Sequence, residues 1–510
     1  MEGYIERQQL VLASRRARYR ARSRDAPGAA MKRPGIALLA AAIAGLARAA
    51  DLPAPNAPSQ AKTPPNCWGS LWDVLNTSPA DCPLTYAGFT LYGTIDMGAG
   101  YNTAGIPFGN SFTNGIYYGI RRASDGARWS LFPSALSTSV VGLKMEEQIY
   151  GDWRLIGAAE FGFSPLSGML INGPRSLADN NLNTLANQTA NGDSSRAGQW
   201  DNSQGFVGVS NKTYGTLTFG RVNALTTDVI SAYDPVRSNA FSLLGFSAAF
   251  AGFGNTQLAR VNTGFIYRLR YQNFRVAGLA QVGNGYALGN GSMGEYQAQI
   301  GATFGGFSID GVVSYAKDAV GLATYAGSGL PAGYDPNSIL RGTLSNNTGV
   351  LAAARYKRDP FEVYAGYTGS RQANPSDAFA NGFETIALGI FVPPGAVNAT
   401  NFNVNRILNA FWVGGKYDIW SNLSVSTGFY YQVQNDFLPS GSVCAGYSTG
   451  ISSNKCAGSQ SALSALVTYR PVRRVDIYAG VMLSNVYGGL AFGHFKSQNI
   501  DPGAGIRVRF

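Results

Sequence analysis

The sequence predicts an all-β fold, a transmembrane antiparallel up-and-down β-barrel of about 16 strands. Segments with alternating apolar and polar residues, most of them about nine to twelve residues long, recur from residue 90 to the end of the chain. Short turns and long loops alternate between these segments, and their apolar faces carry aromatic residues near the strand ends. Soluble β-sandwiches share the alternating segments but lack the strict succession of short and long connections, so the pattern favours a membrane barrel.

The composition agrees with this fold class. The 510 residues include 64 Gly, 27 Phe and 27 Tyr, which suit short strands and tight turns. The mean hydropathy is −0.05, so the chain as a whole is not hydrophobic. The longest apolar run, residues 34–47, is shorter than the roughly 20 residues that a spanning helix requires. A membrane protein with this sequence must therefore cross the bilayer with strands.

The apolar run belongs to a predicted secretory signal, residues 31–49. Met31, Lys32 and Arg33 form a positive n-region, residues 36–46 an apolar h-region, and Ala47-Arg48-Ala49 an A-x-A cleavage site. We expect the mature chain to begin near Ala50. Residues 1–30 carry seven arginines and no apolar periodicity, and either a wrongly chosen start codon or a genuine extended leader accounts for this N-terminal extension.

Removal of the signal changes the charge of the chain. The formal net charge is +11, but residues 1–49 hold ten Lys and Arg against three Asp and Glu. The mature chain keeps 30 basic against 26 acidic residues. A high isoelectric point often indicates nucleic-acid binding. Here most of the excess lies in residues that should be removed, so we expect no nucleic-acid partner.

Residues 50–87 form a predicted periplasmic segment that contains the first of two cysteine pairs. The pairs are Cys67 with Cys82 and Cys444 with Cys456, and an even count in an exported chain predicts disulfides. Three connectivities are possible, and local bonds are the expected ones. Neither pair has CxxC spacing and the only histidine is His494, so we expect no metal site and no cofactor.

The predicted barrel covers residues 88–510. The expected strands are 90–101, 138–149, 153–163, 203–211, 215–222, 263–272, 274–283, 295–304, 307–317, 347–357, 361–370, 408–418, 422–434, 461–471, 474–485 and 502–510. In the strand 295–304, Tyr296, Ala298 and Ile300 share the face expected to contact lipid, whereas Gln297 and Gln299 lie on the lumen face. Glu147 falls on the lipid-facing phase but lies close to a turn, where a charge costs little.

Several segments resemble the general porins of Gram-negative bacteria, a family of trimeric 16-stranded barrels. The segments are residues 91–96 (LYGTID), 141–146 (VGLKME), 205–209 (GFVGV), 214–221 (YGTLTFGR) and the terminal 506–510 (IRVRF). A terminal Phe on an alternating strand is the signal that the family's assembly machinery reads. The two-cysteine segment before the first strand is similar to that of alphaproteobacterial porins.

The resemblance implies an outer-membrane channel for passive diffusion of small hydrophilic solutes and ions. It also implies a homotrimer in contact with outer-membrane lipid and lipopolysaccharide. In the family the third loop, here about 223–262, folds inward and narrows the channel. By position Asp234 matches an acidic loop residue and Arg260 a wall arginine, with Asp228 and Arg221 as weaker matches. Two further wall arginines of the enterobacterial pattern fall near Val140 and Ser203, so that cluster is incomplete here.

The strand phases predict which charges line the lumen. The basic ones are Lys144, Arg154, Arg268, Arg270, Arg355, Lys357, Arg470, Arg507 and Arg509, and the acidic ones are Glu146, Glu160, Asp310, Glu362 and Asp476. Nine against five predicts a weak preference for anions. Charges at the narrowest point should dominate, because the Debye length at physiological salt is about 8 Å.

Two features of the sequence point to other functions. Residues 446–450 match the G-x-S-x-G pattern of serine hydrolases, but they lie in a predicted loop and the single histidine lies in another. An enzyme is therefore not expected. The second alternative is an adhesin whose long loops bind a partner while the lumen is blocked, and conductance measurements distinguish it from an open channel.

Overall fold

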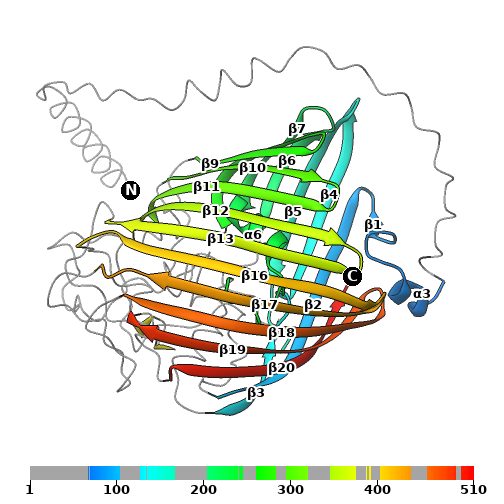
Figure 1. The fold of residues 1–510 in the computed structure, drawn as a ribbon. Helices are drawn as coiled ribbons and strands as arrows, with labels where there is room; N and C mark the ends of the chain where they lie inside the picture. The colour runs from blue at the N-terminus through cyan, green and yellow to red at the C-terminus, as the bar shows by residue number, and fades with distance from the viewer. Residues whose placement is uncertain are drawn as a thin grey trace, which may run out of the picture. The chain divides into compact units, whose positions relative to one another are not determined.

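Sixteen long antiparallel strands close into a barrel, and two shorter strands, β1 and β3, extend the same sheet (Figure 1). The computed structural model describes residues 67, 69–103, 127–133, 135–166, 204–238, 240–244, 260–282, 294–319, 345–374, 386–387, 390–391, 403–437, 457–489 and 496–510. The strands of the sheet are β1 (Leu84–Tyr86), β2 (Phe89–Asn102), β3 (Arg128–Pro133), β4 (Val140–Tyr150), β5 (Trp153–Gly162), β6 (Gly205–Asn211), β7 (Gly215–Asn223), β8 (Arg260–Tyr271), β9 (Phe274–Gln281), β10 (Gly294–Phe304), β11 (Phe307–Ala319), β12 (Ser345–Arg358), β13 (Phe361–Ala373), β16 (Arg406–Trp420), β17 (Leu423–Gln434), β18 (Gly458–Val472), β19 (Val475–Gly488) and β20 (Gln498–Arg509). The predicted fold class is confirmed.

The first and last long strands close the barrel. Strand β20 pairs with β2 in antiparallel register, from Thr94 opposite Arg509 to Gly100 opposite Gly503. The terminal Phe510 continues this ladder, because its N–H donates to the Gly93 carbonyl at 3.0 Å and its carbonyl accepts from Gly93 N–H at 3.0 Å. Closure leaves neither strand with an unpaired edge facing lipid.

Strands β1 and β3, which both pair with β2, are absent from the predicted strands. Residues Phe89 to Thr94 of β2 pair with β4, whereas Met97 to Asn102 pair with β3. The six residues of β3, which ends in Pro133, carry too few alternating positions to be recognised from sequence. Two further short strands, β14 (Ile386–Ala387) and β15 (Ile390–Phe391), pair only with each other.

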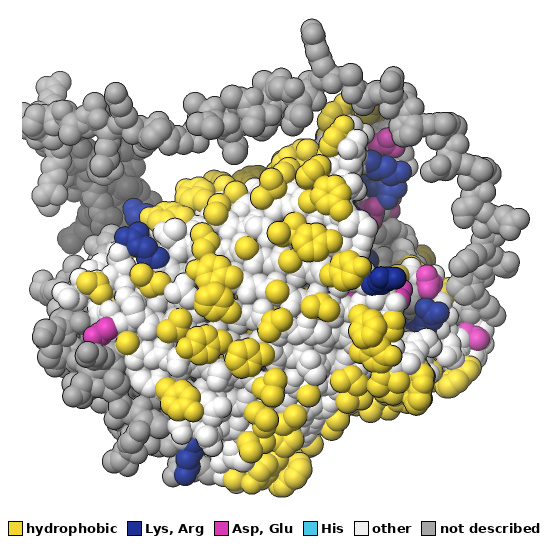
Figure 2. Space-filling model, in the orientation of Figure 1, with side chains coloured by type: hydrophobic (Ala, Val, Ile, Leu, Met, Phe, Trp, Pro, Cys, Tyr) yellow, Lys and Arg dark blue, Asp and Glu magenta, His cyan; other side chains and the backbone are white. Residues whose placement is uncertain are grey.

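The two faces of the wall differ as the sequence predicts. In β10 the outward Tyr296 and Ile300 are 53% and 66% exposed, whereas the inward Glu295 and Gln297 are 2% and 5% exposed. Figure 2 shows hydrophobic side chains spread over the outer wall, while the charged side chains visible on this side gather near the strand ends. The outer surface is therefore suited to lipid and the inner one to water.

Short turns join the strands at one end of the barrel. They occupy residues 151–152, 212–214, 272–273, 305–306, 359–360, 421–422 and 473–474. Outward aromatic pairs lie beside them, among them Phe274 with Phe304 at 5.6 Å and Phe361 with Tyr417 at 4.8 Å between ring centroids. These rings match the predicted aromatic girdle at a membrane interface.

The segment before β1 is fastened to the short-turn end. It contains helix α3 (Leu71–Asn76) and the disulfide between Cys67 and Cys82, which confirms this cysteine pair. The buried Arg474, in the turn between β18 and β19, donates to the carbonyls of Val74, Thr77 and Cys82 at 2.6, 2.9 and 2.7 Å. The predicted signal, residues 31–49, and the Cys444–Cys456 bond lie outside the described residues.

No helix in the described part of the chain combines the length and apolar character needed to cross a bilayer.

Candidate functional site

The third long loop enters the lumen directly after β7. Its first part is helix α6 (Leu225–Tyr233), which contacts β9 through β13 from inside the barrel (Figure 1). Leu225, Val229, Ile230 and Tyr233 recur at helical spacing and are all buried against this wall. The opposite side of the helix carries Asp228 and two small exposed residues, Ser231 and Ala232. One apolar face thus fixes which side chains the helix presents to the channel.

Tyr233, at the end of α6, anchors the helix to the wall. Its hydroxyl donates to Asp310 Oδ2 on β11 at 2.6 Å and accepts from Arg275 Nη2 on β9 at 2.9 Å. Arg275 also forms an ion pair with Asp310. The indole N–H of Trp412, on β16, donates to the Tyr233 carbonyl at 3.0 Å. A charged donor on β9, a neutral donor on β16 and a carboxylate acceptor on β11 therefore hold one residue of the loop.

Asp234 forms a second anchor one residue further on. It is 5% exposed, and its Oδ1 accepts from the Tyr430 hydroxyl on β17 at 2.6 Å and from Val236 N–H at 3.2 Å. Burial raises the pKa of the Asp234 carboxyl above its ordinary value, while these donors oppose the shift. Pro235 packs directly over Gly414, where an added Cβ would lie 2.6 Å from the proline ring. The glycine thus permits the close approach of loop and wall.

The loop then continues across the lumen toward the other side of the barrel. Ala240 N–H donates to the Ala135 carbonyl at 2.8 Å, and Ser238 Oγ donates to the same carbonyl at 2.9 Å. Phe241 is 1% exposed and packs beside Gly480 on β19. The described part of the inward loop is therefore held to the wall at β9, β11, β16 and β17 and again at Ala135 and β19.

The predicted constriction residues separate into two places. Asp234 was expected to face Arg260, but its carboxylate is directed to Tyr430 and is nearly inaccessible. Arg260 opens β8, opposite Asn223, and interacts electrostatically with Glu160 and Asp228. The structure thus makes Asp234 a contact between loop and wall, because its direction is fixed by packing after the helix ends.

Asp228, rather than Asp234, pairs with an arginine of the wall. It forms an ion pair with Arg268 on β8, and the two side chains are 36% and 39% exposed. Asn223 Nδ2 donates to the same carboxylate at 3.2 Å. At the root of the loop, Arg221 donates to the side chain of Asn262. The described contacts therefore gather Arg221, Asp228 and Arg260 near β7 and β8, away from Asp234.

Arg237 is a lumen-facing charge that sequence reasoning left without a role. Its Nη2 donates to the Tyr364 hydroxyl at 3.0 Å and to the Ala232 carbonyl at 3.2 Å, and it lies 3.9 Å from Glu362. Arg275 was also missed, although its phase next to the outward Phe274 indicates a lumen position. No comparable periodicity marks Arg237, which lies in a loop.

The predicted wall residues Arg268, Arg270, Arg355 and Lys357 lie on lumen phases of β8 and β12. Lys357 Nζ lies 3.4 Å from Glu362, and Arg154 pairs with Glu146. Together with Arg268–Asp228 and Arg275–Asp310, these contacts match four of the wall cations with carboxylates. Such pairs largely cancel each other's field.

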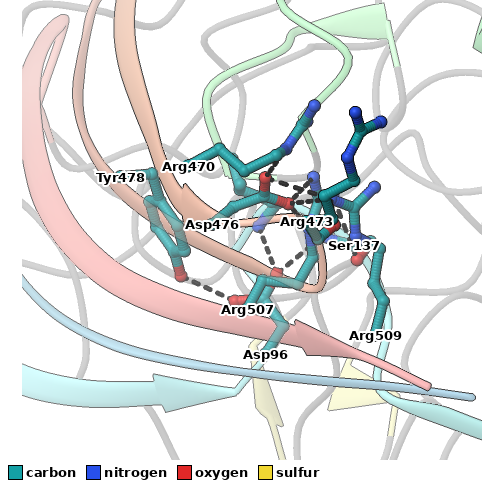
Figure 3. A network of polar contacts seen from close by, with 9 residues as sticks. Asp96, Ser137, Arg470, Arg473, Asp476, Tyr478, Arg507 and Arg509 are labelled. Carbon is teal, nitrogen blue, oxygen red and sulfur yellow. Dashed lines mark hydrogen bonds and ion pairs between the residues drawn. The ribbon is translucent and has the colours of Figure 1, made fainter. Parts of the chain in front are cut away.

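Asp476 contacts more cations than any of these carboxylates (Figure 3). Arg470 Nε, Arg507 Nη2 and Arg509 Nη2 donate to its carboxylate at 2.9, 2.7 and 3.1 Å. The carboxylate is 0% exposed, whereas the side chains of Arg470 and Arg509 are 44% and 31% exposed. Strands β18, β19 and β20 thus place three guanidinium groups around a single carboxylate on the lumen wall.

A closed antiparallel barrel with an apolar exterior, a charged interior and an inward-folded loop is the architecture of an outer-membrane diffusion channel. The model of the Gram-negative porin family matches residues 35–488, and the chain belongs to this family. It therefore forms an outer-membrane channel for passive diffusion of small hydrophilic solutes. Family and fold define a channel rather than an enzyme.

Several solved structures are similar to this chain, and the first of them has the same fold. An anion-selective porin from Comamonas acidovorans is 13% identical, with 83% of this chain and 99% of that chain covered and a TM-score of 0.51. The channel DcaP of Acinetobacter baumannii is 14% identical, with 84% and 99% covered and a TM-score of 0.44. Salmonella typhi OmpF in complex with daunomycin is 11% identical, with 84% and 99% covered and a TM-score of 0.46. No curated protein matches the chain in sequence.

Proposed function

We propose that the loop carrying α6 is the constriction of the channel and that the open lumen prefers small anions weakly. The observation that carries the ion preference is the surplus of guanidinium groups at Asp476, where three arginines share one carboxylate. The ion pairs Arg154–Glu146 and Arg275–Asp310 supply no net charge of their own. A net positive local potential raises the concentration of anions and lowers that of cations along the path.

Within the constriction, Asp228 and Arg268 are the charges that a passing ion meets on the loop and on the wall. Both are partly exposed, so solvent screens them incompletely. Arg221 and Arg260 support the same region from the loop root, and Arg237 adds a cation from the loop itself. Asp234 acts indirectly, by keeping the loop against β17.

We also propose a homotrimer, assembled through the outer faces of β20, β2 and β4. Between Leu91 and Ala99 on β2 the outward positions are aliphatic residues and Gly93, and those between Ile500 and Val508 on β20 are aliphatic residues and Pro502. Strands β8 to β17 instead carry outward aromatic residues suited to lipid, including lipopolysaccharide. The aliphatic middle of this surface favours contact with a second copy. Molecular mass in detergent from light scattering tests this, and a monomer refutes it.

Export through cleavage near Ala50 remains part of the proposal, as does the closer similarity to alphaproteobacterial porins. Mass analysis of the protein from outer membranes tests the cleavage site. A mature chain that retains the arginines of residues 15–24 would refute the predicted signal.

Single-channel recording in planar bilayers tests the proposed function as a whole. Purified protein should give ohmic current steps whose size is set by the constricted lumen. An adhesin with a blocked lumen gives no such steps, so their absence would exclude an open channel.

A further inference from the structure

We propose that Arg470, Arg507 and Arg509 form a saturable binding site for a doubly charged oxyanion, such as inorganic phosphate or a small phosphate monoester. This inference rests on the proposed channel function, because the ligand must reach the lumen wall. It goes beyond a weak preference for anions, since it requires a defined site with its own affinity.

Asp476 holds the three guanidinium groups in place. Both of its oxygens are occupied: Oδ1 accepts from Arg470 Nε at 2.9 Å, and Oδ2 accepts from Arg507 Nε and Nη2 at 3.0 and 2.7 Å. Arg509 Nη2 also reaches this carboxylate at 3.1 Å. Figure 3 shows the three side chains converging on Asp476 from neighbouring strands. A buried carboxylate that accepts this many charged donors orients them without needing a ligand.

Some N–H groups of these arginines do not contact Asp476. Among the described contacts, Arg470 uses only Nε, so its two terminal nitrogens are available on a side chain that is 44% exposed. Arg509 uses Nη2, which leaves its Nη1 available on a side chain that is 31% exposed. These exposed N–H groups can donate to the oxygens of an anion.

The second carboxylate near the cluster does not neutralise it fully. Asp96 is 0% exposed and accepts from the Tyr478 hydroxyl at 2.6 Å and from the N–H groups of Leu136 and Ser137, both at 2.8 Å. Its oxygens are therefore occupied by other donors. Three guanidinium charges face two carboxylates, and Arg473 lies in the adjacent turn. The local charge stays positive.

The geometry of the donors selects oxyanions over halide ions. A guanidinium group presents parallel N–H donors that match two oxygens of a phosphate, whereas chloride accepts as a single point. A recess of about 500 Å³ is lined by Arg470, Thr468 and Ser424, and by the charged residues Lys416, Asp418 and Asp359. Lys416 is paired with Asp418 at 2.6 Å. The hydroxyl groups of Thr468 and Ser424 are uncharged donors in the recess. This space is suited to the uncharged part of a small phosphate ester.

Phosphate titration of single-channel current tests the site. The mature protein is recorded in symmetric KCl with increasing inorganic phosphate, above the second pKa of phosphate, and chloride current should fall to a plateau with a measurable half-blocking concentration. Arg470→Gln and Arg509→Gln should each raise that concentration roughly tenfold, the effect of losing one charge-assisted hydrogen bond. Arg470→Lys keeps the charge but loses the paired donors, so it should raise the concentration as well while leaving the reversal potential in KCl unchanged.

Arg154→Gln is the matched control, because Arg154 is a lumen arginine of similar exposure, 47%, with its own partner Glu146. It should leave the half-blocking concentration within about twofold of the wild-type value. Retention of heat-modifiable migration on gels shows that each variant folds. Current that does not saturate with phosphate, or an Arg154→Gln effect as large as that of Arg470→Gln, overturns the site while leaving the channel intact. Absence of any current step instead refutes the channel function itself.

Discussion

The hydroxyl of Tyr233 donates to Asp310 Oδ2 at 2.6 Å and so joins the inward loop to strand β11 across 77 residues of sequence. Asp310 is 4% exposed and Tyr233 is 3% exposed, so water does not compete with this bond. Arg275 pairs with the same carboxylate and keeps its charge compensated. The position of the constriction therefore depends on a buried contact between loop and wall.

Tyr233→Phe should loosen the inward loop without unfolding the barrel. Loss of the hydroxyl removes one buried hydrogen bond to a charged group, which is worth about 1.5–3 kcal/mol. We expect larger fluctuations of the open-channel current, measured by noise analysis of single-channel records. Tyr267→Phe is the control, because that hydroxyl lies on the outer wall and donates to the Tyr214 carbonyl at 2.6 Å. Equal noise in both variants and the wild type would show that Tyr233 does not hold the constriction.

Ile300→Arg and Gln299→Arg test the two faces of β10. Ile300 is 66% exposed on the lipid side, and a charge near the bilayer midplane costs about 2–4 kcal/mol there. This variant should assemble poorly, as measured by the heat-modifiable fraction in outer membranes. Gln299 lies on the lumen side, where its Nε2 donates to Asp310 Oδ1 at 2.9 Å, so Gln299→Arg should fold and shift ion selectivity. Equal tolerance of the two changes contradicts the strand register.

Arg474→Ala should release the disulfide-closed segment from the short-turn end of the barrel. The guanidinium group donates to three carbonyls of residues 74, 77 and 82, so its loss should lower the free energy of local opening by roughly 2–3 kcal/mol. Limited proteolysis followed by a reducing gel should detect faster cleavage between Cys67 and Cys82. The Arg473→Ala variant, changed at the exposed neighbouring position, should be cleaved at the wild-type rate. If the two variants behave alike, Arg474 does not fasten the segment.

The fold could be predicted almost completely from the residues. Alternation of side chains by two positions follows directly from a wall with lipid on one face and water on the other, so strand positions and lumen residues such as Arg355 and Lys357 could be read from the sequence. Strand β3 could not, because its six residues give too short a pattern.

The orientation of the loop residues was harder to predict. The four-residue spacing of Leu225, Val229 and Tyr233 indicates a buried helix face and places Asp228 on the other side. Asp234 follows the helix, where no periodicity applies, and its direction is set by Tyr430, 196 residues away in sequence. The three arginines around Asp476 were identified singly by phase, but their convergence depends on pairing between β18, β19 and β20.

Asp228→Asn should increase anion over cation permeability. The substitution leaves Arg268 without its carboxylate. Removing a partly exposed charge changes the free energy of a nearby ion by about 1 kcal/mol, so the ratio of anion to cation permeability should rise roughly fivefold at most. Asp234→Asn is the matched comparison, because that carboxylate is 5% exposed, and it should leave the ratio close to the wild-type value. Arg260→Gln should lower anion permeability. A larger shift for Asp234→Asn than for Asp228→Asn would restore Asp234 as the constriction charge.

The reversal potential of the wild-type channel in a KCl gradient tests the central claim most directly. A channel narrowed by the inward loop, with surplus arginine charge on its wall, should give ohmic steps and a reversal potential of the sign set by chloride, of modest size. A reversal potential of the opposite sign, or a barrel that passes no current, would contradict the account.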